Sequence, residues 1–115
     1  MVMVRGVERE VKDLSRQSSI RNDPFVEDFN MTLAQPYSKS VRLNGLATCL
    51  RLEKVYWNIL SAIARSNNCS VNAVLSYIDR EVHLRYGGVK NFSGLIRVVC
   101  VAHLLKADRL EQVQA

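Results

Sequence analysis

The segment from Ser40 to Leu52 constrains the fold more than any other part of this chain. It reads SVRLNGLATCLRL, in which apolar and polar residues alternate on both sides of the dipeptide Asn44-Gly45. Alternation with a period of two predicts β-strand, and Asn-Gly is the dipeptide most favoured in a two-residue hairpin turn. The alternative is that Asn44-Gly45 only interrupts one longer extended segment.

The strand that follows this dipeptide has two different faces. Leu50 and Leu52 share the apolar face. The opposite face carries three residues, which are Ala47, Cys49 and Arg51. A short isolated ribbon is marginal in water because it cannot bury its apolar face alone. We therefore expect a second copy of the chain to supply the partner strand of an antiparallel ribbon.

Three helices are predicted after the ribbon, and the third is apolar nearly all round. The first runs over residues 53–67, and the second follows Ser70, a typical N-cap residue, and ends at Gly87-Gly88. The third has Ser93 as its expected N-cap, and its apolar surface requires burial. A strand and three short helices form only a marginal core. The pattern therefore predicts a mainly α fold with a short β-ribbon, built as an intertwined homodimer.

The excess positive charge lies in the periodic part of the chain. The chain has 115 residues and a formal net charge of +5. Residues 1–39 hold six basic and six acidic side chains, whereas residues 40–115 hold ten basic and five acidic ones. A homodimer would double this excess, which favours a polyanionic partner such as nucleic acid. The alternative is an ordinary solvated surface that is rich in lysine and arginine.

The composition divides the chain into two regions. The apolar positions between Val4 and Leu14 follow helical spacing, and Asn22-Asp23-Pro24 then indicates a turn. We interpret residues 1–39 as an N-terminal arm, partly helical or mobile, that offers a surface to a protein partner. Residues 40–115 carry the ribbon and the three helices.

Other chemistries have little support in the sequence. The three cysteines include no Cys-x-x-Cys pair, so we expect reduced thiols in a cytoplasmic protein. No apolar run approaches the ~20 residues that span a bilayer. The two histidines, His83 and His103, have no set of zinc ligands around them, and no phosphate-binding glycine loop is present. We expect no metal, no cofactor, no membrane contact and no enzymatic activity.

The order of strand, helix and serine-capped helix resembles the ribbon-helix-helix family of DNA-binding dimers. The stretch TCLRL, a helix, and then Ser70-Val71-Asn72 is similar to the Arc and MetJ type of repressor. Residues 40–105 are more similar still to a bacterial ribbon-helix-helix subfamily of small proteins, most of them uncharacterised. The resemblance implies a homodimer with an additional C-terminal helix, which places its ribbon in the major groove of double-stranded DNA.

The resemblance also implies which residues contact DNA. Arg51 matches the outward-facing strand arginine of the family, whereas Ala47 and Cys49 depart from its polar or basic pattern. These three residues are the expected base contacts, with Arg51 the main one. The start of the second helix is implied to bind phosphate. The expected phosphate contacts are Ser70, Val71, Asn72, Arg42, Lys54 and Lys39.

Two classes of function fit this sequence. The first is a dimeric transcriptional regulator that binds DNA through the ribbon. The second is a protein-interaction module derived from the same fold, antitoxin-like or adaptor-like, with weak or no sequence-specific DNA binding. A salt-dependent shift of duplex DNA favours the first class. Co-purification of a stoichiometric protein without DNA affinity favours the second.

Overall fold

The structure is a computed structural model that describes residues 26–114, the last five of them by their backbone alone. The chain divides into two units, Met1–Asn30 and Met31–Ala115. Of the first unit, only residues 26–30 are described, and they include a turn. The amphipathic helix predicted between Val4 and Leu14 lies outside the described residues. Every element discussed below belongs to the second unit.

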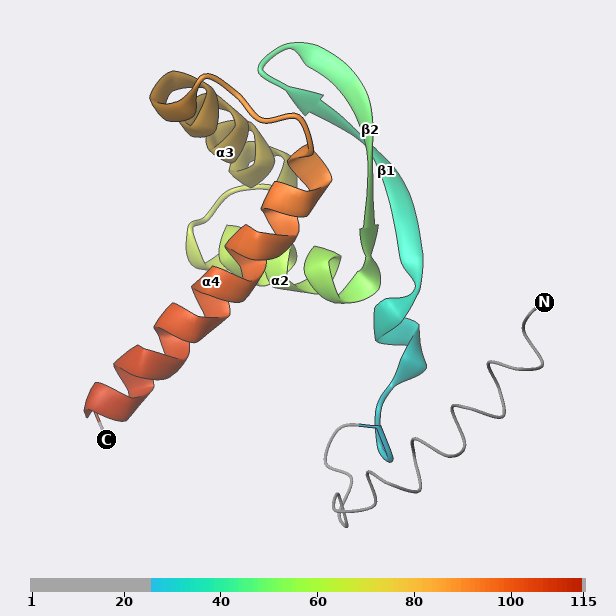
Figure 1. Ribbon diagram of the computed structural model, residues 1–115, viewed down its shortest axis with the longest axis vertical. Helices are drawn as coiled ribbons and strands as arrows, with labels where there is room; N and C mark the ends of the chain where they lie inside the picture. The colour runs from blue at the N-terminus through green and yellow to red at the C-terminus, as the bar shows by residue number, and fades with distance from the viewer. Residues whose placement is uncertain (1–25, 115) are drawn as a thin grey trace, which may run out of the picture. The chain divides into compact units, whose positions relative to one another are not determined.

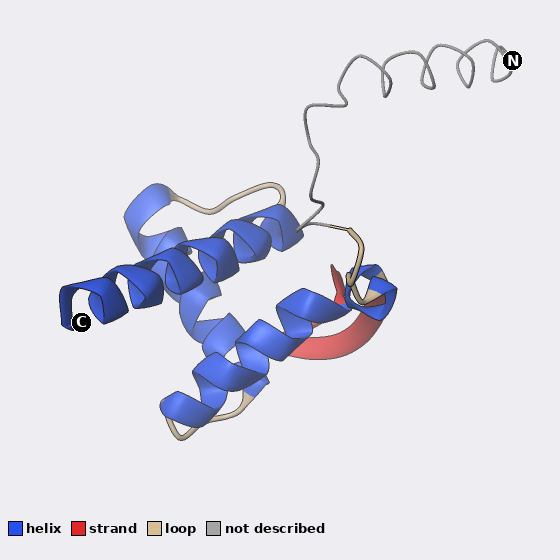
Figure 2. Cartoon of the chain, turned by 90° about the horizontal axis from the view of Figure 1, so that it is seen from below, coloured by secondary structure: helices blue, strands red, loops and turns tan. Residues whose placement is uncertain are grey.

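The second unit consists of a two-stranded ribbon and three α-helices (Figure 1). A short 3-10 helix, η1, precedes the ribbon. The elements in chain order are η1 Met31–Ala34, β1 Pro36–Leu43, β2 Leu46–Glu53, α2 Lys54–Ser66, α3 Val71–Tyr86 and α4 Phe92–Gln114. The helices pack together on one side of the ribbon (Figure 2).

The ribbon is an antiparallel hairpin within one chain. Asn44 has φ 52° and Gly45 has φ 91°, which are the two positive values that a two-residue type I′ turn requires. The strands pair without interruption from Leu43 opposite Leu46 to Pro36 opposite Glu53. The hairpin interpretation of Asn44-Gly45 is confirmed. The structure differs from the expectation that a second copy supplies the partner strand, because residues 36–43 of the same chain already occupy that place.

The first two helices begin and end where the pattern predicts. Helix α2 occupies residues 54–66, within the predicted span. The Ser70 hydroxyl oxygen accepts a hydrogen bond from the Ala73 amide at 3.0 Å, so Ser70 is the N-cap of α3. Gly87 ends α3 with φ 78°, in the left-handed conformation that favours glycine after a helix. These local predictions are confirmed.

The N-cap of α4 is Asn91, and the prediction of Ser93 is wrong. The Asn91 carboxamide oxygen accepts a hydrogen bond from the Gly94 amide at 2.9 Å. Helix α4 begins at Phe92, so the residue that can satisfy its first amides is the one just before Phe92. The Ser93 hydroxyl instead donates to the Asn91 oxygen at 3.1 Å. Asparagine and serine are equally good caps, and the sequence alone did not separate them.

Every main element contributes to one apolar core. Its most deeply buried side chains are Leu52 from β2, Leu60 from α2, Leu75 from α3, and Ile96 and Cys100 from α4. Trp57 is also buried, as expected of a core anchor, and its indole N–H donates to the Tyr37 carbonyl at 3.1 Å. The core therefore fixes one face of the ribbon against all three helices.

The cysteine thiols should differ sharply in reactivity. Cys100 is fully buried, and burial raises its pKa to about 11, whereas Cys49 and Cys69 are exposed. The thiolate is the reactive form. We expect a disulfide reagent at pH 8 to label two thiols rapidly in the native protein and the third only after unfolding. A Cys100→Ala variant should lack only the slowly labelled thiol. Equally fast labelling of all three thiols in the native protein would contradict the burial of Cys100 in α4.

Candidate nucleic-acid interface

The side of the ribbon away from the helices is fully exposed. Directly opposed residues of an antiparallel pair share one face of a sheet. The register pairs three exposed residues of β1 with three of β2, namely Ser38 with Arg51, Ser40 with Cys49, and Arg42 with Ala47. We call these six residues the outward face. The structure therefore brings together the three predicted base contacts and Arg42 on a single surface.

Arg51 is available for an external partner. Its guanidinium makes no hydrogen bond or ion pair with the described residues. Arg42 differs, because its Nη1 donates to the Gly45 carbonyl at 3.1 Å and this holds the side chain near the turn. Arg51 and Arg42 therefore present two positive charges towards opposite ends of the same exposed face.

The carboxylate next to the outward face is neutralised by an arginine of α4. Glu53 ends β2, and its Oε1 accepts a hydrogen bond from Arg97 Nε at 2.9 Å. This hydrogen bond is the main reason that the pKa of Glu53 lies below its usual value. The ion pair joins the end of β2 to α4. It also leaves the outward face with positive charge that no free carboxylate in the described ribbon opposes.

The Glu53–Arg97 pair gives a test through the pH dependence of stability. A carboxylate whose pKa is lowered by folding adds stability above its unfolded value near 4.5, and this stability is lost as pH falls through the folded value. We expect Arg97→Gln to be less stable than the wild type at pH 7. The difference should begin to shrink as pH falls below 4.5, where the unfolded chain takes up the proton, and should be lost only below the lowered pKa of Glu53 in the folded protein. Urea unfolding at pH 7 and pH 3.5 measures it, and an equal difference at both values would show that the pair is not the cause.

The edge of β1 is closed by side chains of α3. The Arg42 amide donates to Asn72 Oδ1 at 2.8 Å, and Asn72 Nδ2 donates to the Arg42 carbonyl at 2.8 Å. The Ser76 hydroxyl donates to the same carbonyl at 2.9 Å. The carboxamide of Asn72 thus pairs with β1 as a neighbouring strand would. These contacts were not predicted, and the only signal for them is that Asn72 and Ser76 are four residues apart on α3.

The hairpin turn is also anchored on α3. The Asn44 side-chain amide donates to the Ser76 carbonyl and to Asp79 Oδ2, both at 3.1 Å. Because the Asn44 side chain is hydrogen-bonded to α3, it is not free to contact a ligand. Asn44 therefore has a positioning role, since it helps to hold the tip of the ribbon on the helix.

The start of α3 lies against the β1 edge, as its contact with Arg42 shows. Ser70 caps the Ala73 amide, and the Asn72 side chain binds the ribbon. The first amides of an α-helix have no partner inside the helix. The backbone amides of Val71 and Asn72 are therefore the groups at this position that suit an anion. Of the predicted phosphate contacts, the structure joins Asn72 to the backbone of Arg42, and Ser70 and Val71 directly precede Asn72 at the start of α3.

The two predicted lysines lie apart from the outward face. Lys39 is opposite Leu50, on the other face of the ribbon, and its Nζ lies 4.8 Å from the centre of the Trp57 ring. Lys54 is the first residue of α2, and its Nζ lies 5.7 Å from the centre of the Tyr37 ring. Both lysines stay at the surface, but neither is grouped with Arg51.

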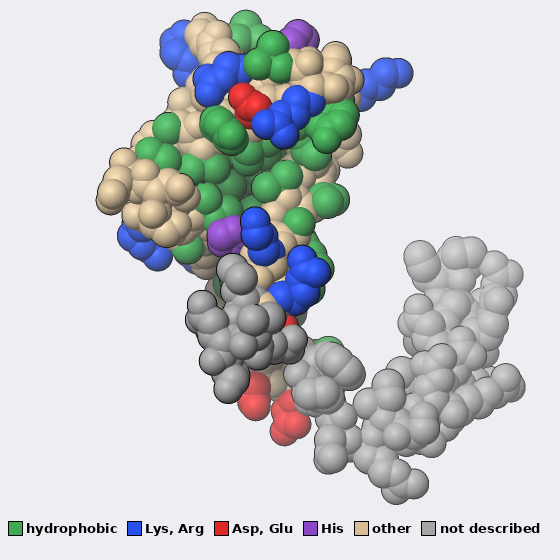
Figure 3. Space-filling model, turned by 90° about the vertical axis from the view of Figure 1, so that its left-hand side faces the viewer, with side chains coloured by type: hydrophobic (Ala, Val, Ile, Leu, Met, Phe, Trp, Pro, Cys, Tyr) green, Lys and Arg blue, Asp and Glu red, His purple; other side chains and the backbone are tan. Residues whose placement is uncertain are grey.

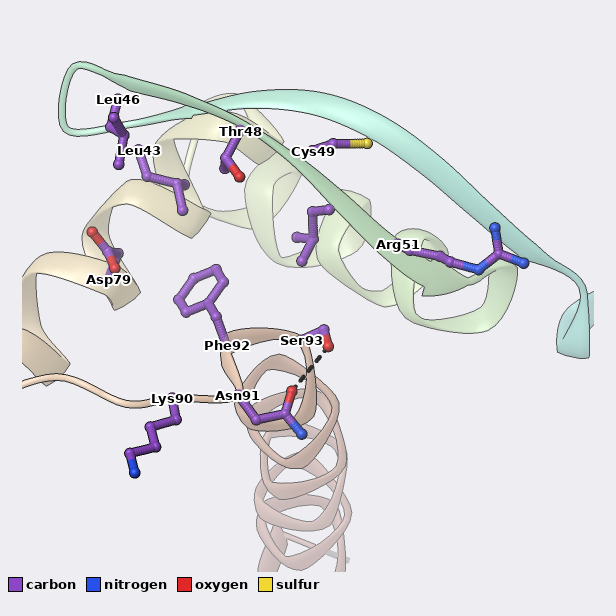
Figure 4. Close-up of a pocket in the computed structure, with 11 residues that line it drawn as sticks. Leu43, Leu46, Thr48, Cys49, Arg51, Asp79, Lys90, Asn91, Phe92 and Ser93 are labelled. Atoms are coloured by element: carbon purple, nitrogen blue, oxygen red, sulfur yellow. Dashed lines mark hydrogen bonds between the residues drawn. The ribbon is translucent and has the colours of Figure 1, made fainter.

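A cavity of about 450 Å³ lies between β2 and the start of α4. Figure 4 shows Leu43 and Thr48 pointing from the ribbon into this space, while Phe92 points up towards them from α4. Lys90 and Asp79 line its outer part. The described residues contain no group of three or more histidine, cysteine, aspartate or glutamate side chains that could hold a metal ion. Cys49 and Arg51, two of the predicted base contacts, are also among the residues that line this cavity.

A wider hollow of about 740 Å³ separates α3 from α4 over the end of α2. Its lining is mostly apolar, and Arg80 and His103 lie among the lining residues. Figure 3 shows apolar side chains gathered over the face it displays, with basic side chains towards the ends. In the described part of the chain, no helix is long and apolar enough to cross a membrane.

The geometry of ribbon and capped helices agrees with comparisons to known proteins. The family described as a ribbon-helix-helix domain matches residues 36–104. The chain belongs to the ribbon-helix-helix domain family. A solved structure of an uncharacterized protein from Bordetella pertussis Tohama I is 27% identical with a TM-score of 0.66, over 80% of this chain and 70% of that one. No curated protein matches.

Family membership confirms the resemblance of the sequence to ribbon-helix-helix proteins. This family is a non-enzymatic DNA-binding fold whose members typically form dimers. The match begins at Pro36, the first residue of β1. Both strands of the hairpin therefore belong to the matched region.

Proposed function

We propose that this protein binds double-stranded DNA by placing the outward face of its ribbon in the major groove. A two-stranded β-ribbon fits that groove. The observation that carries the proposal is the outward face itself, which is exposed, positively charged at Arg42 and Arg51, and free of an unpaired carboxylate. Most sequence-independent attraction of DNA comes from such positive charge. Membership in the ribbon-helix-helix family supports the same function.

The outward face offers limited means of reading a base sequence. Arg51 can donate two hydrogen bonds to O6 and N7 of guanine. Ala47 can make only apolar contact, for instance with a thymine methyl group, and Cys49 is a weak donor. Arg42, with Lys39 and Lys54 farther away, contributes phosphate attraction that is blind to sequence. We infer a regulator of modest specificity whose binding falls steeply with salt.

The start of α3 would bind a phosphate beside the ribbon. A helix N-terminus favours an anion because its free amides and its dipole both point at it. Val71 and Asn72 supply these amides next to Arg42. This arrangement would fix the orientation of the ribbon in the groove without adding sequence information.

A substitution at Ser70 distinguishes phosphate binding by α3 from ordinary helix capping. Ser70→Ala removes the bond to the Ala73 amide and should cost ~1 kcal/mol of stability. If α3 binds phosphate, the same change should also weaken binding to all DNA sequences equally, because it loosens the first turn. Thermal unfolding and fluorescence anisotropy measure the two effects. Lower stability with unchanged DNA affinity would show that Ser70 serves as a cap alone.

The functional unit would be a homodimer that acts as a repressor-type regulator in a bacterial cytoplasm. Exposed apolar side chains on α3 and α4 support association with a second copy. The exposed Cys49 and Cys69, both free thiols, suit a reducing compartment. The arm predicted over residues 1–39 ends before β1, because the ribbon already begins at Pro36. The part of the arm that precedes the ribbon remains a candidate surface for a protein partner, which is the main feature of the alternative function.

Selection from random duplex DNA tests the proposed function directly. We expect the full-length protein to enrich sites that contain a guanine at the position of Arg51, and its affinity to fall steeply with salt. Arg42→Ala should weaken binding to selected and random duplexes alike. No retention of any duplex at 50 mM salt would overturn DNA binding. A stoichiometric protein partner found in that case would instead support the protein-interaction module.

A further inference from the structure

The first strand of the hairpin adds two hydroxyl groups to the outward face. Ser38 and Ser40 are both exposed there, opposite Arg51 and Cys49. Neither serine hydroxyl makes a hydrogen bond with another of the described residues. A serine hydroxyl can donate one hydrogen bond and can also accept. These two hydroxyls are therefore free to contact a ligand of the outward face.

The contacts of Arg42 show how closely the paired side chains of this face lie. The amide and the carbonyl of Arg42 are both bound to α3, so Arg42 and Ala47 form a pair without hydrogen bonds between the strands. Such pairs alternate with hydrogen-bonded pairs along an antiparallel ribbon. The other two pairs of the outward face are therefore of the same kind. Their Cβ atoms lie ~4.5–5.5 Å apart, which places the Ser38 hydroxyl beside the stem of Arg51.

The charge of the outward face is two-fold symmetric, but its hydroxyl groups are not. We consider a two-fold axis that is perpendicular to the ribbon and passes through its central outward pair. The axis exchanges Arg42 with Arg51, Ser40 with Cys49, and Ser38 with Ala47. Each arginine thus falls on an arginine. Each serine falls on a residue that lacks a hydroxyl, because both serines belong to β1.

The two ends of the outward face therefore differ in what they offer a ligand. At the end away from the turn, Ser38 and Arg51 stand side by side, and neither side chain is bound to another described residue. At the turn, Arg42 is held by the Gly45 carbonyl and its backbone is held by α3. Only groups that are free can bond to a base edge. We call Ser38, Ser40 and Arg51 the reading cluster.

We propose that Ser38 and Ser40 determine DNA specificity together with Arg51, so that one ribbon reads a non-palindromic element. The assignment rests on the proposed function, because it concerns the same face and the same class of ligand. Arg51 binds a guanine, and the Ser38 hydroxyl beside it contacts the neighbouring base edge. Ser40 lies two residues along β1, roughly 7 Å away, and contacts a base about two base pairs from that guanine. Serine can bond to either base of a pair, so each hydroxyl adds a modest preference.

The lack of symmetry follows from the hairpin. The symmetry of a DNA site mirrors the symmetry of the protein surface that reads it. A ribbon of two identical strands has a two-fold axis and suits a palindrome. Here both strands come from one chain and differ in sequence. The element under one ribbon therefore has no two-fold axis, whatever the number of ribbons on the DNA.

The variants Ser40→Val and Ser40→Thr test the contribution of the hydroxyl. Valine and threonine both suit an exposed strand and have nearly the same shape, but only threonine keeps the hydroxyl. In fluorescence anisotropy with the full-length chain, we measure the ratio of affinities for the selected and a scrambled duplex. Ser40→Val should lower this ratio roughly 2- to 12-fold, the effect of one hydrogen bond. Ser40→Thr should keep the wild-type ratio.

Thr48→Val is the matched control on the other face of the same ribbon. Thr48 points from β2 into the cavity above Phe92 (Figure 4), so its hydroxyl cannot contact a ligand of the outward face. The loss of a hydroxyl at this position should leave the ratio unchanged. All three variants should keep the wild-type circular dichroism, because both positions are exposed. A ratio that Ser40→Val does not change, or that Ser40→Thr or Thr48→Val lowers equally, overturns the proposal.

Selection from random duplex DNA tests the symmetry of the element. The wild type should enrich a non-palindromic element with the guanine of Arg51 at one end. Ser40→Val should keep this guanine and lose the preference about two base pairs away. Ser38→Val should lose the preference next to the guanine. A palindromic element under one ribbon, or an element that is the same for the wild type and both variants, contradicts the proposal.

The same measurements separate a failure of the reading cluster from a failure of DNA binding. If the wild type retains no duplex at low salt, DNA binding falls and the role of β1 falls with it. If the wild type binds duplex DNA without any preference, DNA binding stands and the reading cluster falls. The same holds if it has a preference that the serine variants leave unchanged.

Discussion

Leu52→Asp is expected to leave the protein largely unfolded at 25 °C. Leu52 is fully buried in β2, at the centre of the contact between the ribbon and the helices. Removing a buried leucine side chain costs ~2–5 kcal/mol, and a carboxylate at the same place has no described partner and must stay protonated or pull water into the core. A small domain has only ~5–15 kcal/mol of stability to lose. Far-ultraviolet circular dichroism and urea unfolding measure the effect.

Leu46→Asp is the matched control for this prediction. Leu46 lies on the same face of the same strand, but it is 70% exposed near the turn. The same chemical change there should cost little, because the carboxylate stays in water. Equal destabilisation by both substitutions would mean that β-strand propensity, and not burial against the helices, governs the stability of the ribbon.

Arg51→Ala is expected to remove most of the sequence preference of the protein. Arg51 is the one residue of the outward face that can make two hydrogen bonds to a base edge and has no hydrogen-bond or ion-pair partner among the described residues. Loss of the Arg51 side chain should weaken the binding free energy for the selected site by ~1–3 kcal/mol relative to that for random DNA. Anisotropy titrations of the selected and a scrambled duplex at one salt concentration give the ratio of affinities directly.

Two other arginine variants control for charge. Arg42→Ala removes a charge from the same face. It should weaken binding to the selected and the scrambled duplex by the same factor, because Arg42 is expected to contact phosphate and not a base. Arg65→Ala removes a charge from the last turn of α2, outside the ribbon, and should change binding least. If Arg51→Ala lowers affinity for selected and scrambled DNA by equal factors, the ribbon does not read bases.

Features that depend on neighbours in the chain were predictable from the sequence. The alternation around Leu50 and Leu52 correctly separated the buried from the exposed face of β2. The caps at Ser70 and Gly87 were likewise predictable, because a helix terminus is decided by backbone groups within a few residues. The group of Ala47, Cys49 and Arg51 on one surface followed from the same period of two. In each case the cause acts within one turn of helix or a few residues of strand.

Features that depend on distant residues were decided only by the tertiary structure. The sequence left open whether Asn44-Gly45 closes a hairpin. In the structure β2 pairs with β1 of the same chain and not with a strand of a second copy, because a strand tethered by a two-residue turn has almost no chain entropy to lose on pairing. The carboxamide of Asn72 closes the β1 edge thirty residues away, which no local pattern indicates. Lys39 likewise lies against Trp57, away from the outward face.

The sequence by itself therefore determined the elements, their faces and their family, since these follow from local propensity and from the period of apolar residues. The tertiary structure decided which strand pairs with which, which polar side chains are used inside the molecule, and which remain free for a ligand. The physical reason is that hydrogen-bonding groups are satisfied by whatever the fold brings near them. Arg51 and Asn72 are both polar residues in a candidate site, yet packing leaves the first free and uses the second to hold the ribbon.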